Sequence, residues 1–239
     1  MIVPNQTRTA RLLQLPETIG LYREILHRHL VDRPAGEIDF FVNPRRFNLL
    51  RGLVGNQLDG KTILNAASGP FAFELFVAPT GARIESFDID PLLPAVHQEL
   101  LERGLIAPSS TFKIADIMGF EPSGQYDVVL INDLFFIKFV DFFAALPRYA
   151  KMLAPRGLLY FDILDVSAAP IWNLLHNDPR YRRYRMDEVR AALVQNGFEI
   201  LEMLPSPGIK GGLDEVARRG MWAVARIANN FAFLARKQN

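Results

Sequence analysis

Residues 61–90, KTILNAASGPFAFELFVAPTGARIESFDID, constrain the fold more than any other stretch of the chain. The short apolar run at 61–66 has the composition of a strand that is buried on both faces. A turn of small residues follows at 67–70, and bulky apolar residues then predict a helix over 71–77. A second strand is predicted at 82–87. Strand, turn, helix and strand in this order predict a parallel βαβ unit.

The second predicted strand ends in Asp88, which lies 19 positions beyond the turn glycine, Gly69. This is close to the spacing of nucleotide-binding βαβ units, where a carboxylate accepts hydrogen bonds from ribose hydroxyls. A turn of small residues also lets a ligand approach the backbone closely. The alternative is an ordinary crossover in which Asp88 caps the following helix.

The segments ILNAASGPFAFELF and IESFDIDP resemble the cofactor-binding core of class I S-adenosylmethionine (SAM)-dependent methyltransferases. The turn lacks the second glycine of a nicotinamide-type G-x-G-x-x-G, which argues against a dehydrogenase. The resemblance implies that the cofactor is S-adenosyl-L-methionine and that the product is S-adenosyl-L-homocysteine (SAH).

The turn departs from the family pattern at three positions. Asn65 stands where an acidic residue is expected; it keeps a carbonyl acceptor but has no charge to attract the cofactor's ammonium group. Ala67 replaces the first glycine, which we expect to be tolerated only if its φ is negative. Phe71 replaces the third glycine, so cofactor binding requires its ring to stay out of the hollow beside Gly69.

The rest of the chain extends the pattern. RYAKMLAPRGLLYFDI, and MDEVRAALVQNGFEI followed by NNFAFLARK, also resemble this family, so that the likeness spans residues 58–237. It implies an α/β fold with a seven-stranded, mostly parallel Rossmann-like sheet, helices on both faces and an antiparallel last strand. The later strands are predicted at 111–115, at 126–131, in the part of 153–164 that follows its Pro-Gly turn, and at 198–204 and 231–236.

The predicted organisation is an N-terminal arm and helical lid at 1–57 and a SAM-binding domain at 58–239. Helical spacing predicts helices at 16–30 and 47–54 within the first part. The alternative to a lid is plain packing of these helices against the sheet edge. An insertion at 205–227, with a helix around 213–225, is a candidate for acceptor choice, for contacts in a homodimer or for simple cover of the sheet edge.

The resemblance also assigns cofactor contacts. It implies that the turn after the first strand holds the methionine part, that Asp88 holds the ribose, and that Asp116 and Ile117 hold the adenine. Alternatively, Asp116 only begins a turn at the end of its strand. The full set assigned to the cofactor is Asn65, Ala66, Ala67, Ser68, Gly69, Asp88, Ile89, Asp116, Ile117 and Asn132.

Residues just beyond the fourth predicted strand lie beside the acceptor in this family. Asp133 is therefore the candidate for orienting the acceptor or taking its proton, and His176 is a second candidate base. Tyr22, Phe135 and Phe136 are candidates for the acceptor pocket, although paired phenylalanines are more often core residues.

Composition excludes several other functions. The chain has no cysteine, which removes disulfides, thiolate metal ligands and thiol catalysis, and we expect no metal site. The formal net charge is only +1, so electrostatics gives no support for nucleic acid as a partner, and we expect none. No apolar run is long enough for a membrane span or a signal peptide, so the expected location is the cytoplasm. The arginines at 180–185 are either solvated surface or ligands of an anionic acceptor.

These features predict methyl transfer from SAM to a small-molecule acceptor by in-line displacement. Alignment of the two reactants is worth about 7–11 kcal/mol, so no catalytic triad or metal is needed. The altered glycine turn keeps an alternative open: a protein of this fold with other chemistry or with a non-catalytic binding role.

Overall fold

The computed structural model describes residues 16–42, 58–136, 138–168, 170, 181–205 and 213–239. Contacts group the chain into two compact units, Met1–Glu121 and Pro122–Asn239. The division into a lid at 1–57 and a SAM-binding domain at 58–239 therefore stays a prediction. The helix predicted at 47–54 lies outside the described residues.

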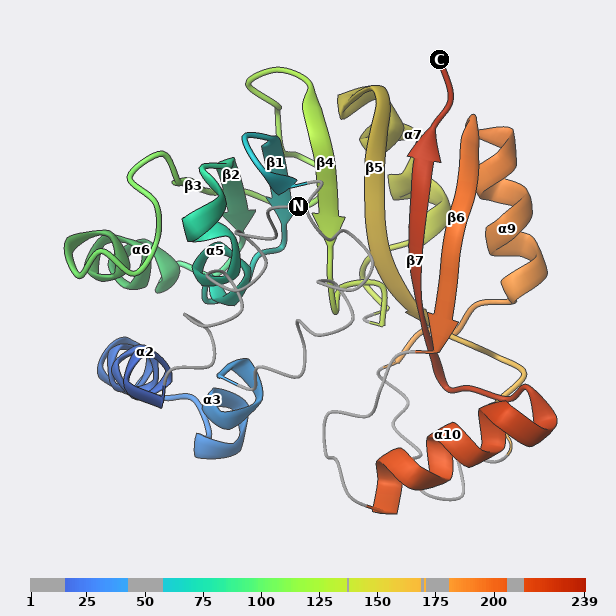
Figure 1. Cartoon of the computed structure of the whole chain (residues 1–239), viewed down its shortest axis with the longest axis horizontal. Helices are drawn as coiled ribbons and strands as arrows, with labels where there is room; N and C mark the ends of the chain where they lie inside the picture. Colours follow the sequence, from blue (N-terminus) through green and yellow to red (C-terminus); the bar gives the residue numbers. More distant parts are fainter. Residues whose placement is uncertain (1–15, 43–57, 137, 169, 171–180, 206–212) are drawn as a thin grey trace, which may run out of the picture. The chain divides into compact units, whose positions relative to one another are not determined.

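The described part of the first unit has three parallel strands (Figure 1). β1 pairs with β2 as far as Ala66↔Phe87, and β2 pairs with β3 as far as Asp88↔Ile114. Parallel pairing places the carboxyl ends of the strands, where site residues were predicted, at one edge. The elements are α2 (Pro16–His29), α3 (Ala35–Phe41), β1 (Thr62–Ala66), α5 (Ala72–Val77), η2 (Ala78–Thr80), β2 (Arg83–Asp88), α6 (Leu93–Glu102) and β3 (Thr111–Ile114).

In the second unit β4 and β5 are parallel, and β7 is antiparallel to both β5 and β6. Its core is aromatic: Phe161 of β5 stacks on Phe233 of β7 at 5.0 Å and on Phe142 of α7 at 4.8 Å between ring centroids. The elements are β4 (Tyr126–Ile131), α7 (Phe142–Met152), β5 (Leu153–Leu164), α9 (Met186–Gln195), β6 (Phe198–Pro205), α10 (Leu213–Ala225) and β7 (Asn230–Lys237).

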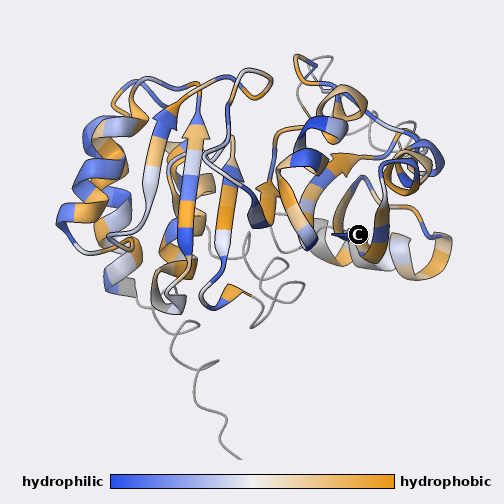
Figure 2. Cartoon of the chain, turned by 90° about the horizontal axis from the view of Figure 1, so that it is seen from above, coloured by the Kyte–Doolittle hydropathy of each residue, from blue (hydrophilic) through white to orange (hydrophobic). Residues whose placement is uncertain are grey.

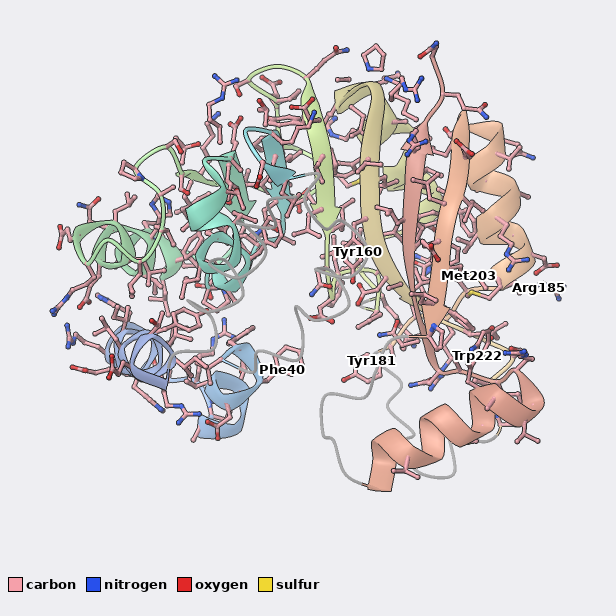
Figure 3. All side chains as sticks on the ribbon, viewed as in Figure 1. Phe40, Tyr160, Tyr181, Arg185, Met203 and Trp222 are labelled. Atoms are coloured by element: carbon pink, nitrogen blue, oxygen red, sulfur yellow. The ribbon has the colours of Figure 1, made fainter. Side chains whose placement is uncertain are left out.

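The strand order is β3-β2-β1-β4-β5-β7-β6, which makes a seven-stranded sheet. This confirms the predicted α/β class, with a mostly parallel sheet and an antiparallel last strand. Hydrophobic residues dominate the strands and alternate with hydrophilic ones along the helices (Figure 2), as expected where helices cover a sheet. The helix predicted at 213–225 in the insertion is confirmed as α10, and Trp222 on it (Figure 3) packs against Phe231 of β7 at 5.3 Å.

One helix was not predicted, and one predicted turn was wrong. α3 begins directly after its N-cap Pro34, whose carbonyl accepts a hydrogen bond from the N–H of Glu37 at 2.8 Å. Proline is well tolerated at a helix start, because no donor is needed there. The Pro-Gly turn predicted before the fifth strand is an irregularity inside β5 instead, where a Cβ on Gly157 would lie 2.9 Å from the Ala154 carbonyl oxygen.

Candidate cofactor site

The turn after β1 holds three residues in the left-handed conformation: Ala67 (φ 52°), Gly69 (φ 56°) and Phe71 (φ 68°). They occupy the three positions where the family pattern has glycine. The expectation that Ala67 needs a negative φ was therefore wrong. A side chain in this conformation costs about 1–2 kcal/mol, so the chain keeps the turn geometry at Ala67 and Phe71 despite the strain. Such strain is concentrated at functional sites.

Asp88 at the end of β2 is tied to this turn. Its Oδ2 accepts a hydrogen bond from the Gly69 N–H at 2.9 Å, and its Oδ1 accepts one from the Asp90 N–H at 3.1 Å. The Ser68 N–H donates to the Phe87 carbonyl at 3.0 Å. Residues that the sequence assigned to the methionine part and to the ribose thus lie in direct contact.

The Phe71 ring is packed away from Gly69. It is fully buried and makes edge contacts with His97 of α6 and Phe112 of β3, each at 5.0 Å between ring centroids. Within the described residues, a Cβ built on Gly69 would have one neighbour inside 4 Å, the Cε1 atom of Phe41 at 3.8 Å. The Phe71 side chain therefore leaves the space beside Gly69 clear.

A buried polar cluster lies behind the turn, where Asn65 of β1 pairs with Ser86 of β2. Asn65 Nδ2 donates to Glu74 Oε1 at 2.9 Å, and the Ser86 hydroxyl donates to the same oxygen. Glu74 is 0% exposed, and burial raises the pKa of its carboxyl group despite these two hydrogen bonds. Sequence reasoning missed Glu74; the signal was a single acid in the otherwise apolar helix AFELFV.

Helices α2 and α3 meet the turn. The Tyr22 hydroxyl, which is buried, donates to the Pro70 carbonyl at 2.7 Å, and Phe41 of α3 is the residue that faces Gly69. Neighbouring Phe40 (Figure 3) makes an edge contact with the Phe41 ring. These contacts place the two helices over the glycine turn. Tyr22, proposed as an acceptor contact, has its hydroxyl bound to the turn itself.

Ion pairs hold α2 against the βαβ core. Glu99 of α6 accepts hydrogen bonds from Arg28 at 2.5 Å and pairs with His29 Nε2 at 2.6 Å. The hydrogen bond with His29 is the largest of the effects that lower the pKa of Glu99. Arg33 donates to Asp90 at 2.8 Å, immediately beyond the Asp88 carboxylate. The end of α2 and the segment that leads to α3 are therefore fixed at several points beside the glycine turn.

The predicted adenine residues lie at the adjoining strand end. The Ala115 N–H donates to the Asp88 carbonyl at 3.0 Å, which joins the two strand ends. Asp116 Oδ1 accepts the Met118 N–H at 2.8 Å, so Asp116 begins a turn, and its role toward the adenine stays a prediction. Ile117 is buried, whereas Ile89 is 68% exposed next to Asp88.

The acceptor residues predicted after β4 belong to the second unit. Asp133 has a left-handed φ of 57°, and its N–H donates to Oδ1 of buried Asp162 at 2.8 Å. Asn132 Nδ2 donates to Asp133 Oδ2 at 2.9 Å. Phe135 is a core residue that packs edge-on against Phe142 at 5.3 Å, as the core alternative requires, whereas Phe136 is half-buried.

The remaining candidates are arginines and His176. Arg182 pairs with Asp141 at 2.6 Å and Arg185 with Asp187 at 2.8 Å, so these two side chains have partners within the protein. His176 and Arg180 lie outside the described residues. Within the part of the chain that the structure describes, no group of three or more His, Asp or Glu residues is placed to hold a metal ion.

Comparison with known proteins rests on structure. No protein-family model and no curated protein matches the chain. Magnesium protoporphyrin IX methyltransferase (ChlM) from Synechocystis PCC 6803, solved with SAH, is similar with a TM-score of 0.64 and 16% identity over 92% of this chain and 99% of that one. The 1,6-didemethyltoxoflavin-N1-methyltransferase of Burkholderia thailandensis is similar with a TM-score of 0.61 and 15% identity over 92% and 90%.

The name of a third similar protein gives a different reaction. The [4+2]-cyclase SpnF has a TM-score of 0.60 and 17% identity over 81% of this chain and 80% of its own. At these identities the likeness establishes the fold. The chain has the fold of class I Rossmann-like SAM-dependent methyltransferases, as the sequence predicted. None of the described helices is long and apolar enough to cross a membrane.

Proposed function

We propose that the protein is a SAM-dependent methyltransferase with a small-molecule acceptor. The observation that carries this proposal is the hydrogen bond between the Gly69 N–H and Asp88 Oδ2 across the left-handed turn. It places a carboxylate beside a backbone that has no side chain at Gly69. The similar structures with bound SAH, ChlM among them, support SAM as the cofactor.

The residues fit such a cofactor. Each Asp88 oxygen accepts one backbone hydrogen bond, and a carboxylate oxygen accepts about two, which leaves capacity for ribose hydroxyls. Ile89 directly follows Asp88, and Met118 lies shortly beyond the end of β3; both are exposed apolar side chains, suited to the faces of an adenine. Asn65, Ala66, Ala67 and Ser68 provide the turn for the methionine part, and Asp116 with Ile117 the adenine edge.

The bound cofactor would supply a sulfonium methyl group that is already activated for displacement. The protein has to hold the acceptor in line with it and to receive the proton that the acceptor loses. We assign these tasks to the segment after β4. Asp133 is the acceptor's base and Asn132, bound to its Oδ2, fixes the carboxylate. His176 stays a second candidate, and half-buried Phe136 a candidate wall of the acceptor pocket.

Calorimetry and thermal unfolding test the cofactor assignment. We expect SAM and SAH to bind the wild type and to raise its melting temperature. At a ligand concentration about a hundredfold above Kd, binding adds about 2.7 kcal/mol to the free energy of unfolding. Asp88→Ala is expected to lose this shift, whereas Asp59→Ala, an exposed aspartate in the turn before β1, keeps it. Absence of binding at millimolar concentrations of both ligands would refute the assignment.

A second function is favoured by the altered turn. This second function is other chemistry, or a purely binding role, on the same fold. It is suggested by Ala67 and Phe71 in glycine positions and by the likeness to SpnF. Incubation with methyl-labelled SAM and a protein-free small-molecule extract separates the two. Methyl transfer predicts a labelled product and stoichiometric SAH. SAM binding without SAH formation in any extract would favour the second function.

A further inference from the structure

The buried cluster behind the turn contains an acid that the family resemblance does not assign. In the family pattern the acidic residue ends the first strand, and here that position is Asn65. The Glu74 carboxyl group comes from α5 instead and lies 2.9 Å from the Asn65 amide nitrogen. The site therefore still has an acid and a polar strand end, but Glu74 of α5 supplies the acid and Asn65 of β1 supplies the polar strand end.

Three side chains converge on this point because of the register. Asn65 and Ser86 are partners in neighbouring parallel strands, so their side chains project from the same face of the sheet. Both donate to Glu74 Oε1, from β1 and β2 respectively. All three residues are buried, and their mutual hydrogen bonds offset the cost of removing these polar groups from water.

The arrangement fixes the orientation of the Asn65 amide. Its nitrogen is directed to Glu74 Oε1, which also accepts from the Ser86 hydroxyl, so a flipped amide would set its oxygen against an oxygen that is already acting as an acceptor. Asn65 Oδ1 is then the atom left to accept from a ligand at the end of β1; among the described residues it has no hydrogen-bond partner. Glu74 Oε2 is buried and has no hydrogen-bond partner in the part of the chain that the structure describes, and burial raises the pKa of the group, which favours its neutral form.

We propose that Glu74 is a positioning residue for the cofactor: by binding Asn65 Nδ2, it keeps Asn65 Oδ1 directed to accept a hydrogen bond from the cofactor's ammonium group. This proposal rests on the proposed function. It explains how the turn can dispense with an acid at the end of β1. It also separates Glu74 from a merely structural residue, because its effect is confined to the amino-acid part of the cofactor.

Two ligands and two Glu74 variants test this. SAH carries the ammonium group, whereas 5′-methylthioadenosine has the same adenosine and sulfur without it. Glu74→Gln keeps an oxygen for Asn65 and Ser86, and we expect both Kd values to stay within about threefold of wild type. Glu74→Met removes the acceptor. It is expected to raise the Kd for SAH by about tenfold, which corresponds to the loss of one hydrogen bond to a charged group. The Kd for 5′-methylthioadenosine should change by less than about threefold.

A reversed pair tests the same point in a variant with a satisfied cluster. In the double variant N65D/E74Q the carboxylate sits on β1 and the amide on α5. We expect this variant to bind SAH at least about threefold more tightly than the wild type does, because a charge now faces the ammonium group. The Kd for 5′-methylthioadenosine should be unchanged. N65D alone sets two carboxyl groups together and is expected to lower the melting temperature, which the double variant recovers.

The outcomes are distinct. Equal weakening of both ligands in Glu74→Met, or a double variant that binds SAH no better than wild type, would overturn the positioning role while leaving the proposed function intact. If the wild type binds 5′-methylthioadenosine but not SAH, the role of Asn65 fails as well. If it binds neither ligand, the proposed function fails and the positioning role fails with it.

Discussion

The Gly69 N–H donates to Asp88 Oδ2 at 2.9 Å, across 19 positions of the chain. This bond joins the left-handed turn after β1 to the end of β2, and it brings together two residues that the sequence had assigned to the cofactor. The turn conformation is what makes the bond possible. Its strained residues, Ala67 and Phe71, should therefore respond to substitution in different ways.

Ala67→Gly is expected to leave stability nearly unchanged. Glycine removes about 1 kcal/mol of strain at the left-handed position but returns a similar amount through the entropy of the unfolded chain. Phe71→Ala keeps the strain and removes a fully buried ring from its contacts with His97 and Phe112, which should cost about 3–5 kcal/mol. Urea unfolding of both variants measures the contrast. A loss below 1 kcal/mol in Phe71→Ala would contradict the packing described for this ring.

The pH dependence of stability should report Glu74. Its folded pKa is raised from 4.5, so between 4.5 and the folded pKa the native state binds more protons than the unfolded state. The free energy of unfolding of the wild type should then fall as the pH rises through this window, by up to about 1.4 kcal/mol per pH unit.

The matched comparison for Glu74 is Glu74→Gln, which cannot titrate. Its stability relative to wild type should increase with pH above 4.5 and level off beyond the folded pKa, whereas the difference should be constant at lower pH. Urea unfolding from about pH 4 to about pH 8, a range that begins just below the ordinary pKa of a glutamate and extends above it, supplies both curves. Parallel curves over the whole range would show that Glu74 has an ordinary pKa.

Tyr22→Phe tests whether the helical cover acts on the turn. The variant removes the hydroxyl that donates to Pro70 and leaves the buried carbonyl without this donor, which should cost about 1–2 kcal/mol. If Tyr22 serves the turn, SAH should bind more weakly and the KM for the acceptor should change little. A raised acceptor KM with unchanged SAH affinity would instead return Tyr22 to the acceptor pocket, as the sequence had suggested.

Much of this fold was predictable because strands and helices carry their periodicity locally. YDVVLI predicted β4, and the helix at 213–225 was confirmed as α10, since apolar runs and helical spacing are set by neighbouring residues. The sign of φ at Ala67 was not predictable in this way. The propensity of alanine argues against a left-handed turn, and the geometry of the βαβ unit overrides it.

The site was predictable where it follows strand ends and not where it depends on packing. Asp88 could be assigned because its distance from Gly69 is fixed by a βαβ unit. The burial of Glu74 against Asn65 depends on how α5 is rotated over the sheet, which a helix of 6 residues does not encode in its periodicity. The same holds for Phe135, whose place in the core is fixed by its contacts with Phe142 and Phe161.

Asp133 and Asp162 allow the chemistry to be separated from its support. Asp133→Asn should lower kcat by about 10²–10⁴ if Asp133 takes the acceptor's proton, with the Kd for SAH unchanged. A variant with an unaltered kcat would exclude Asp133 as the base.

Asp162→Ala acts on Asp133 through the backbone. It removes the carboxylate that accepts the Asp133 N–H at 2.8 Å, so the left-handed conformation at Asp133 loses its partner. We expect a lower kcat, since the base is still present but misplaced. Asp162→Asn keeps an oxygen for the Asp133 N–H and should recover most of kcat. Equal loss in both Asp162 variants would mean that the charge of Asp162, rather than its hold on the Asp133 backbone, is what the reaction requires.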